Sequence, residues 1–170
     1  MKISLKITKL LIQNIRADLS REHRFAAERV GFISCRVADL PEGGLIITAN
    51  NYHPVADEDY LDDPSVGAMM GPTAIRKALQ IAYTDNMCMI HVHMHEHQGI
   101  PKFSKVDLTE SAKFIPDFWN VQPTLPHGTL VLSHNLAAAL CWVPGIRKIL
   151  PVSNITIVGS PLLQLWKKLL

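Results

Sequence analysis

The chain has no marked excess of charge of either sign, no long apolar run and no paired cysteines, and each absence excludes a class of protein. Lys and Arg total 17 against 15 Asp and Glu, without a basic stripe, so the sequence does not predict nucleic-acid binding. No window approaches the roughly 18 uncharged apolar residues of a membrane span. The three cysteines are widely spaced and lack a C-x-x-C pair, which argues against a disulfide framework and favours a reducing cytoplasm: Cys35, Cys88 and Cys141.

Length and composition predict one globular domain over residues 1–170. With 48% hydrophobic residues, a chain of this size can bury a single core without disulfides or structural metals. The N-terminal segment is unlike a signal peptide, because Lys6 and Lys9 interrupt its apolar stretch and no small-residue cleavage site follows. Ile3, Leu5 and Ile7 instead alternate with polar residues, which predicts a half-buried strand.

Hydrophobic periodicity predicts the order of the elements that follow. The spacing of Ile12, Ile15 and Leu19 indicates a helix that ends before residue 28. The other expected segments are a hairpin of strands at 30–37 and 44–50 around a turn at 41–44, an irregular loop at 51–71, a helix from Pro72 to near residue 84, an extended segment at 87–95, strands at 128–134 and 154–160, and an apolar helical face in 161–170. This order predicts an α/β domain in which helices cover a mixed sheet.

Four histidines recur at strict intervals of two, at His91, His93, His95 and His97. On an extended backbone all four side chains leave the same face, and neighbours lie about 6 to 7 Å apart, so two imidazoles can reach one ion. A solvated, histidine-rich edge strand is the alternative. Four histidines in seven residues favour a metal site, and zinc is the common partner of imidazole combined with carboxylate.

Ser104 and Asp107 form an S-x-x-D pattern, which by itself indicates a helix N-cap with its capping-box acid. Gly99 and Pro101 can turn the chain back and present Asp107 to the histidine face. Two imidazoles and one carboxylate leave a fourth zinc position for water, the arrangement of a catalytic site. The pattern therefore predicts hydrolysis.

Glu28 is the candidate general base, because a zinc-dependent hydrolase also needs a carboxylate that moves a proton onto the leaving nitrogen. It lies at the junction between the first helix and the strand that begins near residue 30. The alternative is a solvated glutamate at a helix end.

These residues resemble the signature of the JAB/MPN (JAMM) zinc metalloproteases: an upstream glutamate, H-x-H, a short spacer and S-x-x-D. The matching segments read ERVGFISC at 28–35 and HVHMHEHQGIPKFSKVD at 91–107. The resemblance covers most of the chain and is nearest to small bacterial stand-alone members. It implies a mixed curved sheet flanked by helices, similar to cytidine deaminases, with one Zn²⁺ per chain.

The resemblance implies a role for each matching residue. Glu28 matches the general base, and Ser104 matches the serine that holds the base or stabilises the tetrahedral intermediate. His93, His95 and Asp107 match the zinc ligands, with eight residues between His95 and Ser104 where the family has seven.

The ligand pair stays open at this point, since His91 and His93 are the second possibility. The histidines outside the pair, which include His97, then orient ligands or meet substrate. A second departure from the family pattern is the acidic Glu96, where proline is frequent.

The implied function is hydrolysis of the amide bond after the C-terminal tail of a ubiquitin-like modifier, in processing or deconjugation. The expected partners are that modifier, its conjugates and ubiquitin-activation-like proteins, with no nucleic acid or membrane. Two alternatives remain: a non-catalytic docking module of the same fold, and a zinc peptidase acting on small peptides or a sulfur-carrier tail. A solvated loop is the favoured interpretation of the acidic segment 57–63, although it could also receive basic tail residues.

Overall fold

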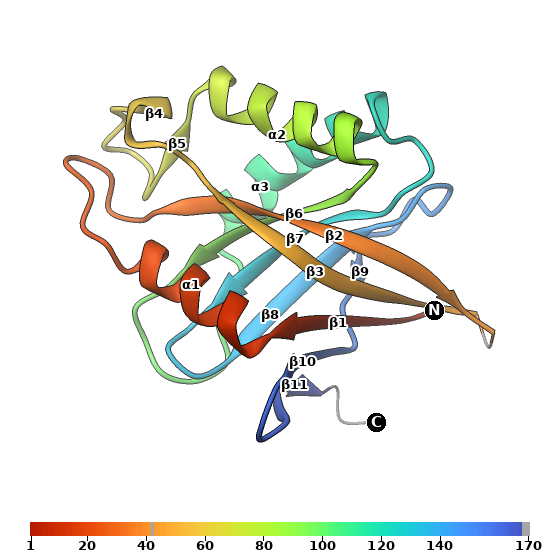
Figure 1. Cartoon of the computed structure of the whole chain (residues 1–170). Helices are drawn as coiled ribbons and strands as arrows, with labels where there is room; N and C mark the ends of the chain where they lie inside the picture. The colour runs from red at the N-terminus through yellow and green to blue at the C-terminus, as the bar shows by residue number, and fades with distance from the viewer. Residues whose placement is uncertain (42, 168–170) are drawn as a thin grey trace.

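A computed structural model describes residues 1–41 and 43–167 and has an α/β architecture. One strongly curled, mixed sheet of nine strands runs through it in the order β11-β10-β1-β3-β2-β6-β7-β8-β9 (Figure 1). The pairs β1–β10, β1–β3 and β6–β7 are parallel, and the other neighbours are antiparallel. No described helix is both long enough and apolar enough to span a bilayer.

The elements follow one another along the chain with short connections. Their bounds are β1 Lys2–Thr8, α1 Lys9–Leu19, β2 Val30–Leu40, β3 Gly44–Pro54, the 3-10 helix η1 Asp57–Asp59, β4 Tyr60–Leu61, β5 Met69–Met70, α2 Pro72–Asp85, β6 Cys88–Met94, α3 Lys105–Phe114, the 3-10 helix η2 Ile115–Asn120, β7 His127–Leu132, β8 Ala137–Trp142, β9 Leu150–Pro151, β10 Asn154–Val158 and β11 Leu163–Lys167.

Two apolar cores lie on the two faces of the sheet. The first buries Ile12, Ile15 and Leu19 of α1 against β1, β3, β6, β7, β8 and β10. The second joins α2, α3 and η2 to the outward residues of β2 and β6. Figure 1 shows α1 on one side of the curled sheet and α2 and α3 on the other. Strands β2 and β6 therefore contribute side chains to both cores.

Local sequence signals determine where the helices begin. The Thr8 side chain accepts a hydrogen bond from the Leu11 N–H at 3.3 Å and caps α1. Pro72 occupies the first turn of α2, where its missing N–H costs nothing, and Asn86 ends that helix at φ +53°. Both helices, the first strand, the hairpin and the extended histidine segment were expected and are confirmed.

Several segments differ from the sequence-based expectation. The hairpin strands are longer than expected, so β3 takes up residues 51–54 of the expected loop, and η1, β4 and β5 form inside the remainder. Strands β8 and β9 were not foreseen, because the alanine-rich stretch 137–142 has no clear strand periodicity. Pairing with β7 supplies the hydrogen bonds that stabilise β8.

The expected helical face in 161–170 is wrong for its described part. Residues Leu163–Lys167 form strand β11, antiparallel to β10, and Leu165 joins the core of the α1 side. The spacing of the leucines fits either structure, but the otherwise open edge of β10 offers backbone partners that a lone helix would not satisfy. Leu169 lies outside the described residues.

Candidate metal centre

The register of β2 and β6 brings the upstream glutamate to the histidines. Val30 pairs with His93 in this antiparallel ladder, and continuing the register by two residues places Glu28 across from His95. Side chains two residues apart on a strand leave the same face, so Glu28 shares a face with His93 and His95. Strand pairing thereby brings together groups that are far apart in the sequence.

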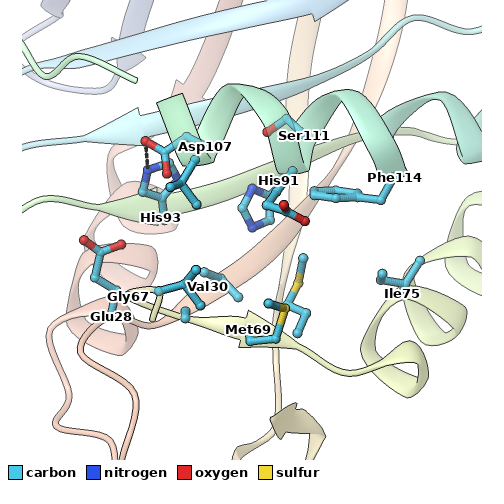
Figure 2. A pocket seen from close by; sticks show the side chains of 15 residues that line it. Glu28, Val30, Gly67, Met69, Ile75, His91, His93, Asp107, Ser111 and Phe114 are labelled. Carbon is cyan, nitrogen blue, oxygen red and sulfur yellow. Dashed lines mark ion pairs between the residues drawn. The ribbon is translucent and has the colours of Figure 1, made fainter. Parts of the chain in front are cut away.

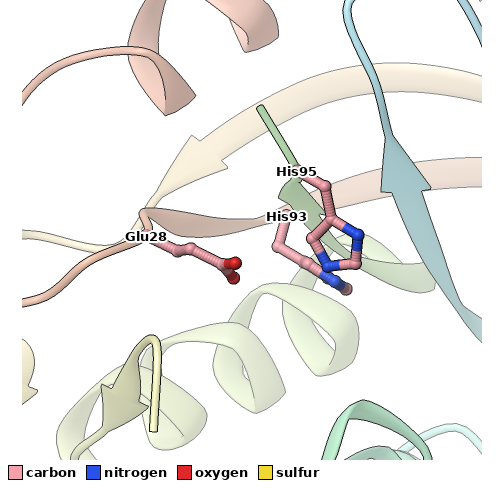
Figure 3. Close-up of side chains that lie close together, drawn as sticks. All are labelled: Glu28, His93 and His95. Carbon is pink, nitrogen blue, oxygen red and sulfur yellow. The ribbon is translucent and has the colours of Figure 1, made fainter. Parts of the chain in front are cut away.

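Glu28, His93 and His95 form a cluster in which the potential ligand atoms all lie within 4.8 Å of one another. Figure 3 shows the Glu28 carboxylate directed toward the two imidazole rings. His93 is only 3% exposed, and neither of its ring nitrogens has a hydrogen-bond partner among the described residues. A buried polar atom without a partner costs about 1–3 kcal/mol. This group could hold a metal ion, which would give the His93 ring the contact it lacks.

Asp107 approaches the same rings from α3. Its Oδ2 atom lies 3.5 Å from Nε2 of His93 and 3.8 Å from Nε2 of His95. Figure 2 shows Asp107 above His93, with Glu28 on the other side of that ring. Ligand atoms held about 2 Å from one ion at tetrahedral angles stand about 3.3 Å apart. Both separations from Asp107 are close to that value, so its carboxylate lies about as far from each ring as a shared ion would require.

The first turn of α3 fixes the Asp107 carboxylate. Ser104 Oγ accepts a hydrogen bond from the Asp107 N–H at 3.0 Å, and the Ser104 N–H donates to Asp107 Oδ2 at 2.6 Å. This is the capping box expected from the sequence. The loop before it is anchored at Gly99, at φ +93°, where the backbone N–H donates to Asn135 and the carbonyl accepts from Ser133. Ser104 therefore positions Asp107.

The charge states of the cluster favour cation binding. Burial, followed by the nearby His93, lowers the pKa of His95. Burial would raise the pKa of Asp107, but its contacts with His93 and the Ser104 backbone outweigh this and hold the pKa well below its usual value. Neutral imidazole and ionised carboxylate are the forms that bind metals. Near neutral pH, His95 and Asp107 are already in these forms.

The backbone around Glu28 is held from two directions. The Glu28 N–H donates to the Gly67 carbonyl at 3.0 Å, and a Cβ atom at Gly67 would lie 3.1 Å from the Glu28 carboxyl carbon. The buried guanidinium of Arg29 donates to the carbonyls of Arg21 and Glu22, both at 2.9 Å, and to Asp57. These contacts, which sequence reasoning missed, position the carboxylate. No local motif marks Gly67, because its role depends on a fold contact.

The outer histidines of the row lie apart from the cluster. His91 is buried on the side of α3 and Phe114, with Nδ1 3.5 Å from the Thr129 hydroxyl. His97 lies beyond the end of strand β6 at Met94. It is exposed, and its Nδ1 lies 2.8 Å from the Gln98 carbonyl. Of the pairs left open by the sequence, the structure brings His93 and His95 together with both carboxylates.

Two acids of segment 57–63 are engaged inside the chain. Asp57 pairs with the buried Arg29 at 2.7 Å, and the buried Asp59 pairs with Lys77. The Arg29 contact lowers the pKa of Asp57. Both carboxylates are paired within the chain, so this part of the segment has a structural role.

Comparisons with known proteins add no family assignment. No family model matches the chain, and no curated protein matches it. Among solved structures, the chain is similar to the Trichoplax adhaerens STIL N-terminal domain, with a TM-score of 0.39 and 12% identity. The alignment covers 82% of this chain and 41% of that chain, and likeness at this level supports no conclusion on fold or function.

Proposed function

We propose that the protein is a zinc-dependent isopeptidase or peptidase of the JAB/MPN type. The meeting of Glu28 with His93 and His95, with Asp107 close to both rings, carries this proposal, because three separate segments of the chain bring potential metal ligands together there. Two imidazoles and a carboxylate are a typical donor set for catalytic zinc. The order of these residues resembles that of the family signature.

In the proposed reaction, His93, His95 and Asp107 hold the ion and Glu28 moves the proton. Zinc supplies Lewis acidity, which lowers the pKa of water from 15.7 to about 7 and polarises a carbonyl. Glu28 accepts a proton from the attacking water, whose oxygen bonds to the amide carbon. As the carbon–nitrogen bond breaks, Glu28 returns the proton to the leaving amine. Ser104 acts by holding Asp107, and its remaining hydroxyl hydrogen is available to a substrate oxygen.

The proposed substrate is the C-terminal tail of a ubiquitin-like modifier, attached to another protein or followed by residues to be removed. The resemblance to the family supports this choice. Strand β5 pairs only with β4 in the described part of the chain, and it lies beside the cluster, so an extended tail can add to it as a further strand. Ubiquitin-activation-like proteins of the same system are the expected partners.

Glu28→Gln tests the proposal directly. The purified variant should keep about one zinc per chain by elemental analysis but lose cleavage of a fusion between a modifier tail and a reporter. Glu58→Gln, an exposed acid in η1, is the matched control and should cleave like the wild type. Retained turnover in Glu28→Gln would refute the assigned base. Full zinc occupancy without cleavage of any tail in the wild type would instead favour a docking module.

A further inference from the structure

A cavity of about 110 Å³ opens directly beside the cluster, between α3, β5 and the end of β2. Glu28, His93 and Asp107 form part of its wall, so it is continuous with the candidate metal centre. Most of the remaining wall is apolar and includes Met70. Figure 2 shows other apolar side chains around the space: Val30, Met69, Ile75 and Phe114. A molecule bound at the cluster would therefore have an apolar recess within reach.

Besides the cluster residues, His91, Glu110 and Ser111 bring polar groups to this recess, and the His91 ring has a nitrogen that is unpaired in the described part of the chain. The ring of His91 projects from β6 into the space between Phe114 and Met69 (Figure 2). It is 8% exposed, and its Nε2 atom has no hydrogen-bond partner among the described residues. Its Nδ1 atom has only the distant Thr129 hydroxyl at 3.5 Å. A ring nitrogen of histidine can take part in one hydrogen bond, so Nε2 is available to a group that enters the recess.

We propose that this recess, which we call the His91 pocket, binds a substrate side chain that flanks the bond to be cleaved. This inference rests on the proposed function. A protein cavity of about 150 Å³ can hold benzene with its six carbon atoms, so a space of about 110 Å³ takes about four non-hydrogen atoms. Apolar walls with one unpaired nitrogen suit an uncharged side chain with an aliphatic stem and a hydrogen-bonding tip. Asparagine has this size and chemistry.

The alternatives fit less well for stated physical reasons. Glycine would leave the recess unfilled, and the side chains of lysine and arginine are longer than the space allows. Of the acids in the wall, Glu28 and Asp107 belong to the cluster and Glu110 pairs with Lys113. Leucine has the same number of atoms as asparagine and a similar branched shape, but it would leave His91 Nε2 unpaired. One net hydrogen bond corresponds to roughly a tenfold difference in affinity.

Matched peptides test the pocket. A set that differs only at one residue, on either side of the cleaved bond, carries asparagine, leucine, glycine or lysine at that position. The zinc-loaded wild type should cleave the asparagine peptide with a kcat/KM about tenfold above that of the leucine peptide. His91→Phe should abolish this preference while still cleaving the leucine peptide. Equal rates in the wild type, or an asparagine preference that survives in His91→Phe, would overturn the inference.

A binding measurement separates this inference from the proposed function. Zinc-loaded Glu28→Gln protein with ¹⁵N-labelled histidine is titrated with the same peptides, and the ring nitrogens are followed by NMR. The asparagine peptide should shift the His91 Nε2 signal and bind about tenfold tighter than the leucine peptide. If no peptide is cleaved by the wild type but this shift occurs, the hydrolase proposal fails and the pocket stands. No shift at any peptide concentration would refute the pocket.

A second variant tests the pocket independently, in case His91→Phe does not fold. Ile75 is half-buried and lines the pocket from α2, so Ile75→Trp reduces the space inside it without altering the buried strand. It should weaken binding of the asparagine and leucine peptides alike while leaving the glycine peptide unaffected. Unchanged binding of all three would contradict the placement of the side chain.

Discussion

Removing the Ser104 hydroxyl should weaken metal binding more than it weakens catalysis by the bound metal. In Ser104→Ala the Asp107 N–H loses its acceptor at 3.0 Å, although the backbone contact to Oδ2 remains. Loss of an N-cap side chain costs about 1 kcal/mol of helix stability. In the proposed site Asp107 binds zinc only when the first turn of α3 is formed, so that cost converts to about a fivefold loss of zinc affinity. Supporting groups around metal ligands typically contribute 10- to 100-fold, so fivefold is a lower bound.

The assay is zinc competition with a chelator of known affinity, combined with kcat for a tail fusion at saturating zinc. Ser104→Thr keeps a hydroxyl at the cap and is the matched control, with affinity near the wild-type value. If the serine acts mainly on the tetrahedral intermediate instead, kcat should fall about 10²- to 10³-fold with zinc affinity unchanged. That second pattern would refute the positioning role argued from the capping box.

Three further predictions concern the surroundings of the site and the core. Gly67→Ala brings a methyl group to 3.1 Å from the Glu28 carboxyl carbon, so kcat should fall while zinc content stays near one per chain. An unchanged kcat would show that the Glu28 carboxylate can move away from the methyl group without loss of activity. Phe118→Ala removes a fully buried ring and should lower the free energy of unfolding in urea by about 3–5 kcal/mol, whereas the exposed control Tyr83→Ala should change it by less than about 0.5 kcal/mol. Burial lowers the pKa of His127 from 6.5 to about 4, so the unfolded chain binds more protons between these values and stability rises with pH across that window, by about 3 kcal/mol at most. The rise should be smaller in His127→Gln when unfolding is followed between pH 4 and 8, and an unaltered profile would contradict this assignment.

Much of the site follows from short-range signals in the sequence. The period of two in His91, His93 and His95 gave their common face, and S-x-x-D gave the capping box that orients Asp107. The spacer length to Ser104 favoured His93 and His95 but left His91 and His93 open, because the choice depends on where β6 ends and on which residue of β6 pairs with Val30. That register is a property of the whole sheet.

The parts of the fold that sequence reasoning missed depend on partners distant in the chain. Leu163–Lys167 carries a spacing that fits a helix, but the edge of β10 makes it a strand. The role of Gly67 was missed for the same reason, because its contact with Glu28 forms only when the segment before α2 has folded back onto Glu28. Local periodicity indicates which face of an element can be buried, but it does not indicate which other element will pack beside it.

The pairing of Val30 with His93 has a consequence for how such a protein can vary through evolution. A strand that slips by a single residue presents its opposite face, so one residue gained or lost between Glu28 and Val30 would turn the acid toward the α1 side of the sheet. Loops elsewhere in the molecule can lengthen or shrink without that penalty. We therefore expect natural variants to keep this two-residue step fixed in length even where its amino acids change.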